Sequence, residues 1–147
     1  MKSLKTLAAV FFAAAVMTLT GCSKDPEDLI IGTWNATKVI STMSYTMGDH
    51  TETETETETF KAGESQMTFK EDGTIIIKST DDDGSTSQES GTYTVNDKKI
   101  TITAEGQTMS GDIVDIDKKE MELKISLSIS EQGMSMTLVA DMFFTKA

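Results

Sequence analysis

Apolar and polar residues alternate most regularly in two stretches of the C-terminal part of the sequence. Residues 121–130 have an apolar side chain at every odd position, and residues 134–144 have one at every even position. Successive side chains of a β-strand point to opposite faces, so both stretches predict strands with one apolar face. A shift by one residue would turn the whole apolar set of either strand to water, which specifies the register of both.

Shorter runs rich in Thr, Ile and Val predict further strands, and no stretch shows a convincing 3.6-residue period. These strands are residues 29–40, entered through Gly32, and residues 66–70, 74–78, 91–95, 99–103 and 108–116. Asp72-Gly73 and Asn96-Asp97-Lys98 supply hairpin turns. Eight or nine antiparallel strands joined by tight turns are typical of a meander that protects its edges by closing. We therefore predict an all-β fold, a single up-and-down antiparallel β-barrel of about eight strands.

Residues 51–59 are a strict alternation of Thr and Glu. In an extended chain the four glutamates share one face and the threonines the other, so neither face is apolar and register is weakly specified. We expect an edge strand or a mobile loop. The glutamates could form a cation-binding strip, but carboxylates in line do not converge on one point, which favours a solvated, self-repelling segment.

Residues 79–90 predict a polar loop. Asp81, Asp83 and Gly84 fit positions of a calcium-binding loop, whereas Ser79 and Ser90 stand where the first and the bidentate ligands belong. Without those ligands and without flanking helices we predict no metal site here, although the sequence leaves open whether the acidic loops bind calcium.

Residues 1–21 have the layout of a secretory signal peptide: Lys2 and Lys5 precede an uncharged apolar run from Leu7 to Leu19. The run closes on Leu-Thr-Gly-Cys, which resembles the lipobox of bacterial lipoproteins. The resemblance implies that Cys22, the only cysteine, is acylated, with palmitate among its chains, and becomes the first residue of the mature protein. The alternative is an ordinary buried thiol beside a conventional cleavage site.

Residues 22–28 then predict a lipidated, extended tether, which contains the only proline, Pro26. Ser23 after the cysteine, and the Lys-plus-acidic cluster that follows, resemble signals of lipoproteins exported to the outer membrane and its surface. A merely soluble spacer explains the same residues. We expect a lipid-anchored outer-membrane protein, and the cluster after Cys22 adds exposure at the cell surface as an alternative to the inner leaflet.

Charge excludes one class of partner. Cleavage before Cys22 removes two lysines and no acid, which leaves 11 lysines against 24 acidic residues and changes the formal net charge from −11 to −13. The chain has no arginine. Nucleic acid and anionic lipid headgroups attract cationic surfaces, so we set nucleic-acid binding aside. The 126 residues that remain suit one domain, residues 29–147, which we expect to be a monomer.

Gly32-Thr33-Trp34 resembles the Gly-X-Trp motif of lipocalin-like (calycin) domains. Residues 69–74, 91–93 and 143–146 are similar in order and spacing to the lipocalin-like domains of bacterial surface lipoproteins, so that the resemblance covers residues 29–147. Such domains commonly place an arginine of a late strand against the tryptophan. Here only Lys146 or Lys124 could stand in, so we expect Trp34, with Gly32, to close the barrel base as part of the core.

The resemblance implies a barrel interior that could hold a small hydrophobic ligand. We predict no cofactor. Flexible methionines suit adaptable pockets but are also ordinary core residues, and small barrels can be hollow or filled. We place the candidate ligand cavity at Met67, Phe69, Tyr93, Leu123 and Met136. The alternative is a non-catalytic envelope interaction protein with a filled barrel, which presents residues 51–59 and 81–89 to a protein partner.

Catalysis is the least supported class of function. His50 is the only histidine, no serine stands in a recognisable nucleophile motif, and one histidine without a free thiol cannot build a metal set. Asp49 and His50 are neighbours, but adjacent residues of a strand point to opposite faces. We predict that the protein is not an enzyme and that it has no catalytic residues and no metal site.

Overall fold

The structure is a computed structural model that describes residues 24–147. A short helix, α2 (Pro26–Ile30), precedes nine strands in the described residues. The strands are β1 (Gly32–Met47), β2 (His50–Thr59), β3 (Ser65–Phe69), β4 (Thr74–Thr80), β5 (Thr86–Asn96), β6 (Lys99–Ala104), β7 (Gln107–Ile116), β8 (Glu120–Glu131) and β9 (Met134–Lys146).

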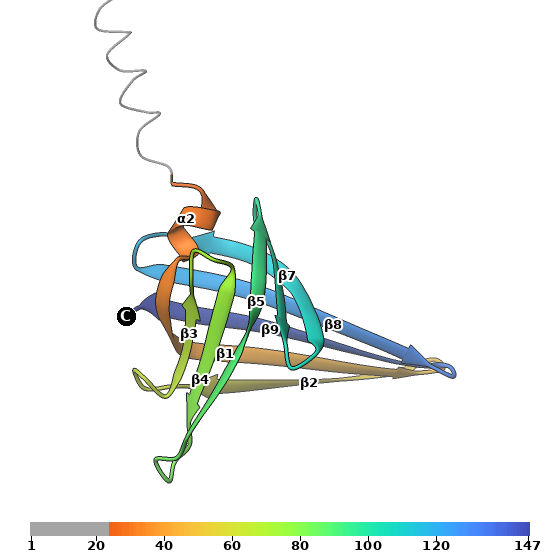
Figure 1. Cartoon of the computed structure of the whole chain (residues 1–147). Helices are drawn as coiled ribbons and strands as arrows, with labels where there is room; N and C mark the ends of the chain where they lie inside the picture. The colour runs from red at the N-terminus through yellow and green to blue at the C-terminus, as the bar shows by residue number, and fades with distance from the viewer. Residues whose placement is uncertain (1–23) are drawn as a thin grey trace, which may run out of the picture.

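All strands belong to one antiparallel sheet that closes on itself (Figure 1). From β3 to β9 each strand pairs with the next in the sequence, and β1 joins β9 on one edge and β3 on the other. These eight strands form the predicted barrel. The fold class predicted from the sequence is therefore confirmed, since tight turns leave a meander few alternatives to closure.

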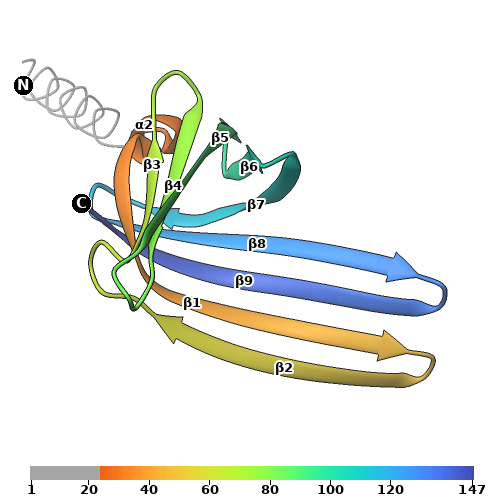
Figure 2. The same ribbon diagram turned by 60° about the horizontal axis from the view of Figure 1, so that its bottom comes forward.

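The ninth strand, β2, lies outside the barrel. β1 is 16 residues long and pairs with β3 only through Gly32–Asn35, so its second half is free to pair with β2 on the same edge. β8 likewise continues past Ile125, its last residue paired with β7. The hairpins β1–β2 and β8–β9 therefore leave the barrel together, joined through β1 and β9 (Figure 2). We call this four-stranded sheet, residues 41–56 and 126–140 in the order β2-β1-β9-β8, the extension.

Large apolar side chains fill the barrel near the end where β1 begins. The most deeply buried are Trp34, Phe69, Phe144, Ile30, Ile75, Ile100, Ile102, Ile113 and Leu123. They come from α2 and seven of the strands and form one cluster, and no polar side chain within the described residues is fully buried. Burial of one such side chain contributes about 1.5–3 kcal/mol, so this cluster supplies most of the stability of the fold.

Three predictions about the elements need correction. The first strand begins at Gly32, not residue 29, and runs to Met47, seven residues beyond Ile40. Residues 26–28 are not extended, because α2 covers the barrel base and buries Ile30 there. The polar loop over residues 79–90 shrinks to 81–85, since β4 and β5 pair as far as Thr80 and Thr86. Of the two outcomes expected for residues 51–59, the edge strand is the one observed.

Candidate functional site

Four of the five residues predicted to line a ligand cavity lie in or against the barrel core. Phe69 and Leu123 are fully buried, and Met67 and Tyr93 pack against the core cluster that contains them. The Phe69 and Tyr93 rings meet edge to face with centroids 4.9 Å apart, and the Tyr93 hydroxyl donates to the backbone oxygen of Lys70 at 2.7 Å. Burial, together with the nearby acidic residues of the β3–β4 turn, raises the pKa of Tyr93. These four residues line none of the three pockets described below.

The base of the barrel carries the Gly-X-Trp motif as a packed cluster. Trp34 is fully buried, and its Nε1–H donates to the backbone oxygen of Ile30 at 2.7 Å. The Lys146 Nζ lies 4.2 Å from the centroid of the Trp34 ring and donates to the backbone oxygens of Leu29 and Ile31. Burial lowers the pKa of Lys146. Lys146 is thus the cation placed against the tryptophan.

Gly32 makes room for that lysine. A Cβ at this position would stand 2.9 Å from the Lys146 Cε, and the Gly32 φ of +125° is one that other residues rarely adopt. Lys124, the other lysine considered, instead pairs with Asp141 at 3.2 Å on the outer face. Gly32, Trp34 and Lys146 thus pack together with α2, and the motif closes the base of the barrel.

The fifth predicted residue, Met136, lies near the start of β9, in the extension, and lines an open groove of about 460 Å³. Residues paired across the antiparallel strands share a face of the sheet. One such row joins Tyr45, Met136, Ile129 and Glu52, and the next joins Met47, Met134, Glu131 and His50. The apolar side of the groove therefore comes from the middle strands β1 and β9 and from β8.

This apolar surface is continuous with the barrel interior. The same strand faces carry buried Leu123 and Phe144 inside the barrel and then emerge with Leu127, Ile129 and Met134. The exposed fraction is 48% for Tyr45, 67% for Met47, 44% for Leu127, 46% for Ile129 and 54% for Met134. Isolated exposed apolar residues are ordinary, but a contiguous patch marks a binding surface.

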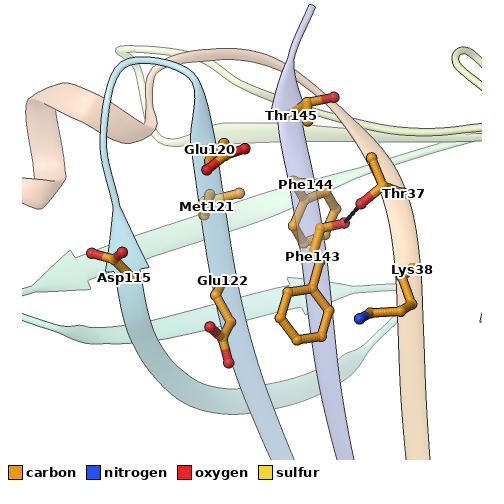
Figure 3. A pocket seen from close by; sticks show the side chains of 9 residues that line it. All are labelled: Thr37, Lys38, Asp115, Glu120, Met121, Glu122, Phe143, Phe144 and Thr145. Carbon is orange, nitrogen blue, oxygen red and sulfur yellow. Dashed lines mark hydrogen bonds between the residues drawn. The ribbon is translucent and has the colours of Figure 1, made fainter.

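Two further pockets have different linings. One of about 310 Å³ lies on the outer face of the barrel, where the Phe143 ring stands between Glu122 and Lys38 and the Lys38 Nζ lies 4.4 Å from the ring centroid (Figure 3). Asp115 and Glu120 complete its polar rim. The other, about 350 Å³, lies at the β8–β9 turn and shares Met134 and Ser135 with the groove. The first is polar and partly covered by its own lysine, which leaves the groove as the main apolar site.

The carboxylates of the acidic turns accept hydrogen bonds from the backbone of the same turns. Asp83 accepts from the backbone N–H of Ser85 at 2.8 Å, and hydrogen bonds from Ser85 lower the Asp83 pKa. Within residues 24–147 no three carboxylate or imidazole groups gather into a possible metal site. His50 contacts Glu52 through Nε2 and Oε1 at 3.2 Å, so its partner is not its neighbour Asp49.

The predicted leader and the predicted lipidation site, Cys22, fall outside the described residues. Among residues 24–147 no helix has the length and apolarity needed to cross a membrane. The groove residues Tyr45, Met47 and Ile129 were not predicted as a site. Their signal was present, because Met43, Tyr45 and Met47 alternate with polar residues just after the first predicted strand, and Ile129 belongs to the apolar face predicted for residues 121–130.

Comparisons with known proteins agree with this architecture. Residues 30–123 match the family described as "Lipocalin-like domain". A lipocalin-like protein from Bacteroides uniformis shares the fold with a TM-score of 0.53 and 13% identity, over 81% of this chain and 99% of that one. An uncharacterized protein from Bacteroides eggerthii gives 0.50 and 14%, over 80% and 98%.

Lobster apocrustacyanin A1 is a more distant match, with a TM-score of 0.47 and 12% identity over 83% of this chain and 63% of that one. The search of curated proteins returned no match. The matched residues 30–123 make up more than half of the sequence and include the Gly32-Thr33-Trp34 motif of the closed barrel base. The chain belongs to the lipocalin-like domain family.

Proposed function

We propose that this protein is a binding protein without catalytic activity that holds a small apolar ligand in the groove of the extension. Lipocalin-like folds usually serve as non-catalytic binding proteins, and a barrel of this kind is consistent with small-ligand binding. The observation that carries the proposal is the open apolar face of residues Tyr45, Met47, Ile129, Met134 and Met136.

This proposal moves the ligand site from the barrel interior to the groove of the extension, outside the barrel. Phe69 and Leu123 both belong to the buried core cluster, so a ligand there would have to displace core side chains. In the groove a ligand would cover side chains that water now reaches. The groove volume of about 460 Å³ also lies within the range of about 300–1,000 Å³ typical of small-molecule sites.

We further propose that lipid on Cys22 tethers the barrel to the outer membrane. Three residues separate Cys22 from α2, which begins at Pro26 and covers the base of the barrel. The groove lies at the opposite end of β1, whose 16 residues at about 3.3 Å each span roughly 50 Å. Such a tether would hold the base near the membrane and the groove away from it. A Cys22→Ser variant should lose radiolabelled palmitate and leave the membrane fraction, and retention of both would refute the anchor.

Binding can be tested with the neutral fluorescent probe N-phenyl-1-naphthylamine. We expect the full chain to bind it, and Ile129→Asn to weaken binding about fivefold or more, since loss of an apolar contact of about 1 kcal/mol corresponds to that factor. Val114→Asn is the matched control, because Val114 is another branched strand residue, 41% exposed, that lines no described pocket. Absence of probe binding to the unsubstituted chain would refute the proposed function. Equal loss in both variants would refute the groove as its site.

A further inference from the structure

The face of the extension that carries the groove is acidic as well as apolar. The β1–β2 register pairs Glu52 with Tyr45, Glu54 with Met43 and Glu56 with Ser41. Paired residues share a face, so these carboxylates lie in a row along one side of the apolar surface. Glu131 borders the groove from the β8 side.

The opposite face of the extension fixes this arrangement. The threonines of β2 meet hydroxyl residues of β1: Thr55 pairs with Thr42 at 3.3 Å, and Thr51 with Thr46 at 3.0 Å between their Oγ1 atoms. Ser44 and Thr53 make the same contact at 3.1 Å. Cross-strand hydroxyl pairs of this kind favour the face on which the threonines of β2 meet the hydroxyl residues of β1, so the threonine ladder directs every glutamate of the repeat to the groove side.

Within the extension no lysine stands on the same face as that row. The groove-face positions of its four strands hold four glutamates and no lysine. Lys146, the lysine that continues this face into the barrel, lies at the barrel base against Trp34. Within the described residues Glu54, Glu56 and Glu58 make no ion pair, and Glu52 contacts only His50. Consecutive glutamates stand about 6.6 Å apart along the strand, so the row is a fixed concentration of negative charge beside an apolar surface.

We propose that the groove selects cationic amphiphiles: small molecules in which an ammonium or similar cation adjoins an apolar group. The apolar group lies on Tyr45, Ile129 and Met136, and the cation faces Glu52 and Glu54. This inference rests on the proposed function and names the ligand class of the same site.

Charge argues against the other occupants of this face. A fatty acid or an anionic lipid would bring its negative group against Glu52 or Glu131. A second copy of the chain would bring another row of glutamates. These charges would either face the first row or lie unpaired in a buried interface, and both arrangements are unfavourable. The groove volume, about 460 Å³, also matches a compact ligand more closely than a protein surface.

The test compares three ligands of one shape and different charge: 2-naphthylmethylamine, 2-naphthylmethanol and 2-naphthoate. Their affinities are measured by calorimetry on the full lipidated chain in phosphatidylcholine nanodiscs, with empty nanodiscs as the blank. We expect the amine to bind at least tenfold more tightly than the alcohol and the carboxylate to bind most weakly. The advantage of the amine should shrink as salt is raised from 20 to 500 mM, because exposed charges are screened.

Two variants assign the effect to the row. Glu52→Gln with Glu54→Gln should bring the amine to within twofold of the alcohol and leave alcohol binding unchanged. Glu71→Gln with Asp82→Asn removes the same charge from exposed turns away from the groove and should keep the preference. Thermal unfolding of both variants confirms that each is folded.

Other outcomes would overturn the inference, the role of the glutamate row or the proposed function. Equal binding of alcohol and amine to the unsubstituted chain overturns this inference and leaves the proposed function standing. An amine preference that persists in Glu52→Gln with Glu54→Gln overturns the role of the row. Failure of all three ligands to bind overturns the proposed function as well. A dimer in sedimentation that Ile129→Asn dissociates would assign the face to a second copy and also overturn the inference.

Discussion

The contact between Lys146 and the barrel base predicts a large cost for a substitution near the C-terminal end of β9. Lys146→Met keeps a side chain of similar length and removes the ammonium. The backbone oxygens of Leu29 and Ile31, which accept from Nζ at 3.0 and 2.6 Å, would lose their donor. Trp34 would lose the cation above its ring, 4.2 Å from the centroid.

The magnitude follows from these three interactions. A hydrogen bond from a charged donor contributes about 1.5–3 kcal/mol, and a cation–π contact about 0.5–2 kcal/mol. Two terms reduce the total: Lys146 is only partly buried, so water replaces some of what is lost, and the variant no longer desolvates a charge. We expect a loss of about 3 kcal/mol, which corresponds to a fall in Tm of roughly 10 °C for a domain of this size.

Trp34 is the only tryptophan and lies at the perturbed site, so its fluorescence reports unfolding in urea directly. Lys124→Met is the matched control, since it removes the same group from a pair with Asp141 on the outer face. Exposed ion pairs contribute about 0–1 kcal/mol, so the control should stay close to the unsubstituted protein. If the free energies of unfolding of the two variants lie within about 0.5 kcal/mol of each other, the assigned role of Lys146 is wrong.

Three further predictions test other parts of the fold. Gly91→Ala places a Cβ against the backbone oxygen of Thr103 and should lower stability by about 3 kcal/mol in urea unfolding, whereas a neutral result would show that β5 and β6 separate easily. Backbone N–H groups of the β7–β8 turn hold the pKa of Asp117 below its ordinary 3.8, so this carboxylate stabilises the fold above that pH and the benefit is lost as the pH falls through the lowered pKa. Asp117→Asn should therefore lower Tm at pH 7 and have no effect well below pH 3.8, and a difference that persists in acid would contradict this. Glu54→Val with Glu56→Val should cause thioflavin-positive aggregation through the β2 edge, whereas glutamine at both positions should cause less, and two equally soluble variants would count against edge protection.

The sequence predicted the barrel because its late strands alternate strictly and its turns contain Gly, Asn and Asp. It also held an unused signal for Lys146. Inward residues of β9 are even-numbered, as Phe144 is, and inward residues of β8 are odd-numbered, as Leu123 is. Lys146 therefore had to point inward and Lys124 outward, and strand parity alone would have chosen between them.

Two features could not be predicted from local pattern. The alternation in β8 is the same before and after Ile125. Only the structure shows that pairing with β7 ends at Ile125, and this is where the barrel ends and the extension begins. Residues that share one pattern thus divide into barrel core and open groove. The five-residue helix α2 is too short to form by itself, and its stability comes from the burial of Ile30 and the bond from Trp34.

The Thr–Glu repeat of β2 serves two requirements that the extension creates. A ten-residue strand with an unpaired edge, beside an apolar face, is a template for pairing with another sheet. Alternating threonine attaches β2 to β1 through hydroxyl contacts, and alternating glutamate makes a second β2 strand repel the first. The same glutamates border the groove, so the residues that keep the apolar face free of other sheets also determine the charge of the ligand that reaches it.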